Sequence, residues 1–228
     1  MLTERQTALL TSIITEHIRT ALAVASEFLV DRCKLECSPA TVRSEMLTLD
    51  EQGYLKKTHT SSGRIPTEKA YQHYVDYGPK PVVLLERQKQ KLQEAMDEGA
   101  DERAKVKGLL RTMADISDEF ILTAFTENDF YYTGLTNLFS KPEFSDQAVV
   151  CNVSAIIDHL DARLKLVFNS LGDECHVFVG KNNPIDSKLS FIAVKVADEG
   201  PLVALLGPMR MRYSANVALI EYCKKLLS

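Results

Sequence analysis

The sequence predicts an α+β protein that is divided into domains, and three observations support this. The chain has 228 residues, 45% hydrophobic and 25% charged, as is typical of globular proteins of one or two domains. Apolar residues recur at helical spacing in the N-terminal part, whereas short apolar runs between turn residues appear in the C-terminal part. A Gly-Pro-Lys-Pro segment at 78–81 predicts a boundary after the N-terminal part.

The composition excludes several classes of protein. The net charge of −4 rules out a protein that is basic throughout, although it allows a local basic face. No uncharged run reaches about 18 residues, so no transmembrane helix is expected. The N-terminus carries Glu4 and Arg5 and lacks the apolar stretch of a signal peptide, so we expect a cytoplasmic protein.

The five cysteines predict neither a disulfide scaffold nor a metal site. Their number is odd and they form no paired Cys-x-x-Cys frame, which is typical of a reducing compartment. Cys33 and Cys37 lie four residues apart, but no second pair of ligands stands at zinc-finger spacing.

Three helices are predicted at the start of the chain, over residues 4–20, 23–32 and 39–52. Ser38-Pro39 provides an N-cap followed by proline at the first position of the third helix. One face of the third helix is apolar and is expected to point into the core, with the residues Val42, Met46 and Leu49.

A two-stranded ribbon is predicted after these helices. Residues 54–59 have a strand pattern, 60–63 form a tight polar turn that ends in glycine, and 64–66 return as a short strand. A further helix over 68–76 precedes the boundary. Three helices followed by a ribbon is the order of a winged helix-turn-helix domain, which we assign to residues 1–78.

In such a domain the third helix lies in the major groove of DNA. Small polar side chains on its outer face let it approach the base edges, and Arg43 could donate a bidentate pair to guanine or bind a phosphate. Basic and hydroxyl side chains of the ribbon suit the phosphate backbone. The predicted DNA-binding residues are Ser38, Thr41, Arg43, Ser44 and Thr48 on the helix, and Lys56, Lys57, His59, Ser61, Ser62 and Arg64 on the ribbon.

The charge of this region supports an alternative interpretation. Residues 1–80 contain ten lysines and arginines and ten aspartates and glutamates, so their net charge is zero. A DNA-binding domain usually carries a basic stripe. The alternative is therefore a winged helix that binds another protein and has no specific affinity for DNA.

A helical linker is predicted for residues 79–126. Residues 84–96 form a charged helix, and 101–125 form a longer one with an apolar stripe from Val106 to Ala124. Such a helix must pack on a partner, and this stripe is wide enough to touch a second one. We therefore expect a homodimer built from this helix and the domain that follows it, residues 127–228, as a regulatory and dimerisation domain; the alternative is a monomer that pairs only on DNA.

A second α+β domain is predicted for residues 127–228. A helical region is followed by apolar runs of strand length, a turn and a closing amphipathic helix. The expected elements are a helix over 146–170, strands at 176–179, 191–196 and 202–206, a hairpin turn at 198–200 and a closing helix capped by Ser214.

An enzyme is not indicated. The reactive residues that stand next to each other are Asp158-His159, Asp173-Glu174 and Cys175-His176, and none has the spacing of a phosphate loop, a nucleophile elbow or a metalloprotease. Neighbours on a strand also point to opposite faces, which separates Cys175 from His176. We expect no catalytic activity, no cofactor and no metal.

Residues 37–76, CSPATVRSEMLTLDEQGYLKKTHTSSGRIPTEKAYQHYVD, resemble the heat-inducible transcription repressor family of the HrcA type. The pattern of that family runs SxATxRxEMxxLxxxGYLxxPHTSxGRIPTxxGYRxYVD, and the match is long and without gaps. Further resemblance lies in GLTNLFSKPEFSD (134–146), VFVGKNN (177–183) and GPMRMRYS (207–214).

The resemblance implies a function and an architecture. Such repressors bind, as dimers, an inverted-repeat operator called the CIRCE element upstream of chaperone operons, and a GroEL-type chaperonin keeps them active. Their architecture is a winged helix plus a GAF-like domain that carries an inserted dimerisation domain. The partners implied are therefore a double-stranded DNA operator, a second copy of the chain and a chaperonin, but no membrane.

This chain departs from the family pattern in three ways. It is shorter, with the shortfall between Phe125 and Tyr131, so the dimerisation insert and the first strands of a truncated GAF-like domain are expected to be missing. Glu27 stands where the family usually has a basic residue, and Ser44 where it usually has asparagine. Ala21-Leu22-Ala23 replaces a turn that contains glycine and proline.

GAF-like folds often hold small ligands. Arg210, Tyr213 and Asn182 are the side chains that could contact one here, but structural roles are favoured because a ligand site needs a mostly preformed cavity. We expect Arg210 to brace the turn at Gly207-Pro208.

Overall fold

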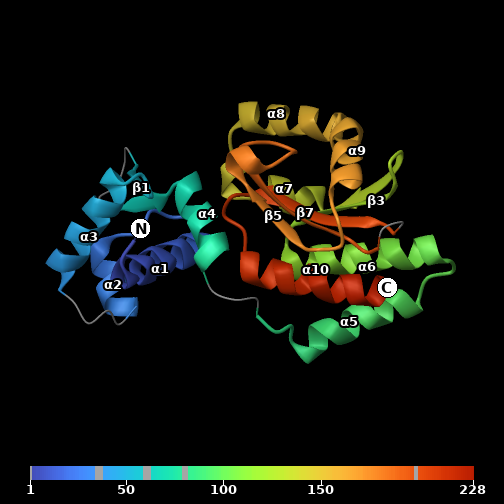
Figure 1. The fold of residues 1–228 in the computed structure, drawn as a ribbon, viewed down its shortest axis with the longest axis horizontal. Helices are drawn as coiled ribbons and strands as arrows, with labels where there is room; N and C mark the ends of the chain where they lie inside the picture. Colours follow the sequence, from blue (N-terminus) through green and yellow to red (C-terminus); the bar gives the residue numbers. More distant parts are fainter. Residues whose placement is uncertain (1, 34–37, 59–62, 79–81, 198–199) are drawn as a thin grey trace. The chain divides into compact units, whose positions relative to one another are not determined.

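The computed structural model describes residues 2–33, 38–58, 63–78, 82–197 and 200–228. They form two compact units, Met1–Pro79 (unit 1) and Lys80–Ser228 (unit 2). Both are drawn in Figure 1. The division falls inside the Gly-Pro-Lys-Pro segment.

Unit 1 consists of helices and a short antiparallel ribbon, in the order that the sequence predicts. Lys56 in the first strand of the ribbon stands opposite Ile65 in the second. The described elements are α1 (Glu4–Thr20), α2 (Ser26–Cys33), α3 (Pro39–Glu51), β1 (Leu55–Lys57), β2 (Arg64–Pro66) and α4 (Glu68–Tyr77).

Side-chain caps begin three of these helices. The Thr3 hydroxyl accepts from the Gln6 amide and the Gln6 side chain accepts from the Thr3 amide, which forms a capping box on α1. Ser38 and Thr67 cap α3 and α4. The buried core of unit 1 includes Leu9, Leu10, Ile13, Ile14, Leu29, Val42, Met46, Leu49, Leu55 and Tyr71, so the inward face predicted for the third helix is confirmed.

Ala21 ends α1 in a left-handed conformation. Its φ is 59°, and its amide donates to the carbonyl of His17 at 2.9 Å. A Cβ makes this backbone region unfavourable, so glycine is the residue that such a helix end prefers.

Ala21→Gly is therefore expected to raise the free energy of unfolding of unit 1 by about 0.5–1 kcal/mol, because it removes the Cβ clash at positive φ. Thermal and urea unfolding would measure the change. Ala25→Gly is the matched control, since Ala25 has no positive φ; it should lower stability by a similar amount. Destabilisation by both substitutions would contradict the argument.

Unit 2 contains a five-stranded antiparallel sheet in the order β4-β3-β7-β6-β5. Figure 1 shows α6 and α10 against one face of this sheet, with α5 outside them, and α7, α8 and α9 on the other face. The described elements are α5 (Glu86–Asp97), α6 (Glu102–Ser117), β3 (Phe120–Thr126), β4 (Asp129–Thr133), α7 (Leu135–Phe139), η1 (Pro142–Phe144), α8 (Gln147–Asp158), α9 (Leu160–Ser170), β5 (His176–Val179), η2 (Gly180–Asn182), β6 (Leu189–Lys195), β7 (Leu202–Pro208) and α10 (Tyr213–Leu227).

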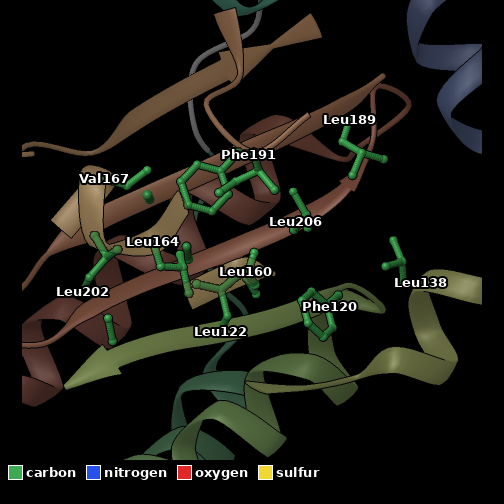
Figure 2. Close-up of a cluster of buried hydrophobic side chains, with 14 of the residues drawn as sticks. Phe120, Leu122, Leu138, Leu160, Leu164, Val167, Leu189, Phe191, Leu202 and Leu206 are labelled. Carbon is green, nitrogen blue, oxygen red and sulfur yellow. The ribbon is translucent and has the colours of Figure 1, made fainter. Parts of the chain in front are cut away.

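A hydrophobic cluster fills the space between the sheet and the helices α7, α8 and α9. Figure 2 shows Leu122, Phe191 and Leu206 of the strands together with Leu160 and Leu164 of α9. All five side chains are at most 4% exposed. Helices therefore cover both faces of the sheet, and its central strands are buried on both sides.

The prediction of one helix over 101–125 is wrong. Helix α6 ends at Ser117, where Asp118 adopts a left-handed φ of 59° and its amide donates to Ala114. The chain then continues as strand β3, which pairs with β4 and β7. The linker predicted for 79–126 is accordingly part of unit 2, since α5 and α6 pack beside the sheet and β3 belongs to it.

The truncation predicted near Phe125 also differs from the structure. Two strands, β3 and β4, stand where the first strands were expected to be missing, and a turn at Glu127-Asn128 joins them. The helix predicted for 146–170 is divided into α8 and α9 at His159. Ser214 is not the cap of the closing helix, because α10 already begins at Tyr213.

The three C-terminal strands are confirmed as β5, β6 and β7. The tip of the predicted hairpin turn, residues 198 and 199, lies outside the described residues, but β6 and β7 are antiparallel and the Val196 amide donates to Pro201 at 3.0 Å. In the described parts of the chain, every helix is too short or too polar to cross a bilayer.

Candidate nucleic-acid interface

Helix α3 presents a polar face to solvent. Its start is fixed by Ser38, whose Oγ accepts from the Thr41 amide at 3.2 Å and lies 3.0 Å from Thr41 Oγ1. Because the apolar residues of α3 point inward, Arg43 and Ser44 are exposed and Thr48 is half-buried. All five residues predicted on this helix therefore lie on its outer side or at its cap.

Arg43 has an acidic partner that the sequence did not reveal. Its Nη2 donates to Glu27 Oε1 of α2 at 2.6 Å. Glu27 is 16 residues away in the chain, and only the packing of α2 against α3 brings the two side chains together. No periodicity within a single helix could have predicted this pair.

The ribbon is tied to the turn that precedes α2. The Val24 amide donates to the Arg64 carbonyl and the Arg64 amide donates to the Val24 carbonyl, both at 2.9 Å. A Cβ on Gly63 would lie 3.0 Å from Ala23, so this close approach favours glycine there. The ribbon is thus fixed relative to the two helices whose outer sides carry Glu27 and Arg43.

Lys56 and Lys57 are exposed on β1, as a phosphate contact requires. Arg64 differs from the expectation. Its Nε donates to Asp50 Oδ2 of α3 at 2.6 Å and its side chain is only 13% exposed. The guanidinium therefore joins the ribbon to α3. His59, Ser61 and Ser62 lie outside the described residues.

Residues 83–217 match the family described as HrcA protein C terminal domain. This chain belongs to the HrcA family. Two relatives carry the name heat-inducible transcription repressor HrcA. The one from Lysinibacillus sphaericus is 41% identical over 126 residues, which is 55% of this chain and 35% of that protein. The one from Fructilactobacillus sanfranciscensis is 32% identical over 193 residues, 83% of this chain and 51% of that protein.

The HrcA relatives are longer than this chain, which spans 35% and 51% of the two just named. The relative of the same name from Halalkalibacterium halodurans is 23% identical over 334 residues, covering 100% of this chain and 97% of that protein. Since this chain has 228 residues, more than a hundred of those positions have no counterpart in it. A solved structure described as a hypothetical protein at 2.2 Å resolution has the same fold, with a TM-score of 0.76, 16% identity and coverage of 100% and 98%.

Two of the motifs that resemble the HrcA family, residues 134–146 and residues 207–214, meet at the junction between α6 and β3. From the first motif, Asn137 Nδ2 donates to the Glu119 carbonyl at 3.2 Å and Lys141 Nζ lies 3.5 Å from Glu119 Oε2. From the second, Gly207 lies so close that a Cβ there would be 2.7 Å from Glu119 Oε2, and Arg212 donates to the Ser117 carbonyl at 2.6 Å.

Glu119 is the buried charge at the centre of this junction. Its side chain is 3% exposed. Burial raises its pKa to about 7, although the positive charges of Lys141 and Arg212 and the nearby polar side chain of Asn216 act in the opposite direction. The carboxyl group therefore titrates near neutral pH, well above an ordinary glutamate.

Of the three side chains considered as ligand contacts, Arg210 and Tyr213 are engaged within unit 2. Arg210 forms a bidentate pair with Glu143 of η1, Nε to Oε1 at 2.6 Å and Nη2 to Oε2 at 3.0 Å. The turn after β7 is thus joined to η1. The Tyr213 hydroxyl is buried and donates to the Met209 carbonyl at 2.6 Å. Asn182 lies in η2.

The described residues contain no cluster of three metal-ligating side chains. Among the cysteine side chains that the structure describes, Cys151, Cys175 and Cys223 are free thiols. Burial raises the pKa of Cys175 to about 12, so this thiol does not supply a nucleophile at neutral pH. Cys37 lies outside the described residues, so the structure gives no geometry for the pair of Cys33 and Cys37.

Proposed function

We propose that unit 1 is a winged helix-turn-helix domain and that the chain represses chaperone genes by binding an inverted-repeat operator of the CIRCE type. The observation that carries the proposal is the outer face of α3, capped by Ser38, beside a ribbon with exposed Lys56 and Lys57. Small polar side chains and cations in this arrangement suit a DNA groove and its phosphates. The names of the HrcA relatives support a repressor role.

The same proposal includes the partners. A palindromic operator requires two copies related by a twofold axis, so we propose a homodimer, with a GroEL-type chaperonin as modulator of its activity in the cytoplasm. The contact between the copies lies outside the apolar stripe of α6. Val106, Leu109, Leu110 and Met113 of that stripe are at most 4% exposed and belong to the core.

A gel shift tests the function directly. The protein should bind a CIRCE-type inverted-repeat duplex at least about a hundredfold more tightly than a scrambled duplex of the same composition, at a fixed physiological salt concentration. Equal affinity for the two duplexes would refute sequence-specific repression. Light scattering of the free protein would then show whether two copies associate without DNA.

A second candidate is a winged helix that binds another protein. It is favoured by the zero net charge of residues 1–80 and by the pairing of Arg43 with Glu27 and of Arg64 with Asp50, which neutralises two predicted DNA contacts. Under this alternative both duplexes bind weakly and with the same salt dependence.

Lys57 and Arg64 should respond differently to neutralisation. Lys57→Gln is expected to lower the salt slope of DNA binding by about one and to leave stability unchanged. Arg64→Gln removes the partner of the half-buried Asp50 and should cost about 1–2 kcal/mol of unit 1 stability. Salt titrations of DNA binding and urea unfolding of both variants check this. A slope that is unchanged in Lys57→Gln would remove this lysine from the interface.

A further inference from the structure

The ion pair between Arg43 and Glu27 lies on the surface of unit 1. The distance from Nη2 to Oε1 is 2.6 Å, and the side chains are 64% and 60% exposed. Exposed pairs of this kind contribute about 0–1 kcal/mol, so a competing anion or hydrogen-bond acceptor can open them at low cost.

The carboxylate of this pair is held in its charged form. Glu27 is in the first turn of α2, where its own backbone amide and the Ser26 hydroxyl donate to it, and these bonds together with Arg43 hold its pKa below the ordinary value. A negative charge is also favourable at this end of a helix. Glu27 is therefore negative throughout the neutral pH range.

Two other ion pairs of unit 1 have a different character. Arg64 and Asp50 are 13% and 30% exposed, and Arg5 binds Glu45, which is 15% exposed. Each of these pairs has a shielded member and joins two elements. Among the three, the pair of Arg43 and Glu27 is the one in which both partners face solvent on the outer side of α2 and α3.

We propose that Glu27 is a specificity-determining residue, which makes the release of Arg43 depend on the DNA sequence; this inference rests on the proposed DNA-binding function. On any duplex, Glu27 repels nearby phosphates. When Arg43 binds a phosphate, it gives up the Glu27 carboxylate and so only exchanges one anionic partner for another. On a guanine opposite α3, Arg43 gains two hydrogen bonds to O6 and N7. Glu27 therefore weakens binding to all DNA, and weakens binding to non-operator DNA most.

Glu27→Gln tests this because it keeps the shape of the side chain and removes its charge. Dissociation constants would be measured for the CIRCE-type duplex and its scrambled counterpart over a range of salt concentrations. We expect affinity for the scrambled duplex to rise about tenfold and for the inverted repeat about threefold. The salt slope on the scrambled duplex should steepen by about one, because Arg43 then binds a phosphate.

Two controls isolate the effect. Asp76→Asn removes one negative charge from an exposed position on α4 and should change both affinities by the same small factor. In an Arg43→Gln background, Glu27→Gln should no longer change the ratio of the two affinities, because the residue acts through Arg43. A thermal melt should show that Glu27→Gln leaves the fold intact.

The outcomes separate this inference from the proposed function. If Glu27→Gln raises the affinity for both duplexes by the same factor, Glu27 only repels DNA in general. If Glu27→Gln weakens binding of the inverted repeat, Glu27 positions Arg43 on its base. Either result overturns the inference. If the unmodified protein does not distinguish the two duplexes, the proposed function fails and the inference fails with it.

Discussion

Glu119→Gln is expected to raise the free energy of unfolding of unit 2 by about 1–3 kcal/mol at pH 8 and by less than about 0.5 kcal/mol at pH 4.5. Glutamine resembles the protonated carboxyl group in shape and charge. At pH 8 the substitution removes a buried negative charge, whereas at pH 4.5 the folded protein already holds Glu119 neutral.

The sign follows from the two protonation equilibria. In the unfolded chain Glu119 has the ordinary pKa of 4.5, and in the folded chain burial raises it to about 7. Between these values the folded state binds a proton that the unfolded state has lost, so stability falls as the pH rises from about 4.5 to 7 and then levels off. At about 1.4 kcal/mol per pKa unit, the full effect is at most roughly 3.5 kcal/mol.

Urea unfolding followed by circular dichroism at several pH values would measure this. Asp118→Asn is the matched control, because Asp118 contacts the same Lys141 at 3.1 Å but is 64% exposed. For Asp118→Asn, the plot of unfolding free energy against pH should stay parallel to that of the unmodified protein. If the profile of Glu119→Gln is parallel as well, the group that titrates near pH 7 is not Glu119. The charged groups around Glu119 are Lys141, Asp118 and Arg212.

Met113→Lys is expected to unfold unit 2, at a cost of at least about 4 kcal/mol. Met113 is fully buried on α6, within the same stripe as Leu109 and Leu110. An ammonium group there would be desolvated among apolar side chains. Circular dichroism should show loss of structure, and the sample should aggregate in light scattering.

Asp115→Lys is the control for this prediction, since Asp115 lies on α6 two residues further on and is exposed. It should leave the fold and the oligomeric state intact. If Met113→Lys stays folded and only dissociates a dimer, the stripe of α6 is an interface between two copies rather than core. That result would restore the dimer contact predicted from the sequence.

The sequence allowed much of unit 1 to be predicted, because its signals are local. A cap at Ser38 and a face that repeats every 3.6 residues act over a few residues. The same periodicity assigns Thr41, Ser44 and Thr48 to the outer side of α3. The acids that hold Arg43 and Arg64 could not be predicted in this way, because Glu27 and Asp50 reach them across packed elements.

The sequence by itself determined the order of elements in unit 1, the three C-terminal strands and the boundary near residue 79. Only the tertiary structure decided where α6 ends. Phe120, Ile121 and Ala124 continue the apolar spacing of the helix, yet they belong to β3, which helices cover on both faces. A strand buried on both sides has no alternation of polar and apolar residues, so it cannot be distinguished from a buried helix by periodicity. Its pairing with β4 and β7 settles the conformation, because every backbone amide and carbonyl inside the core needs a partner.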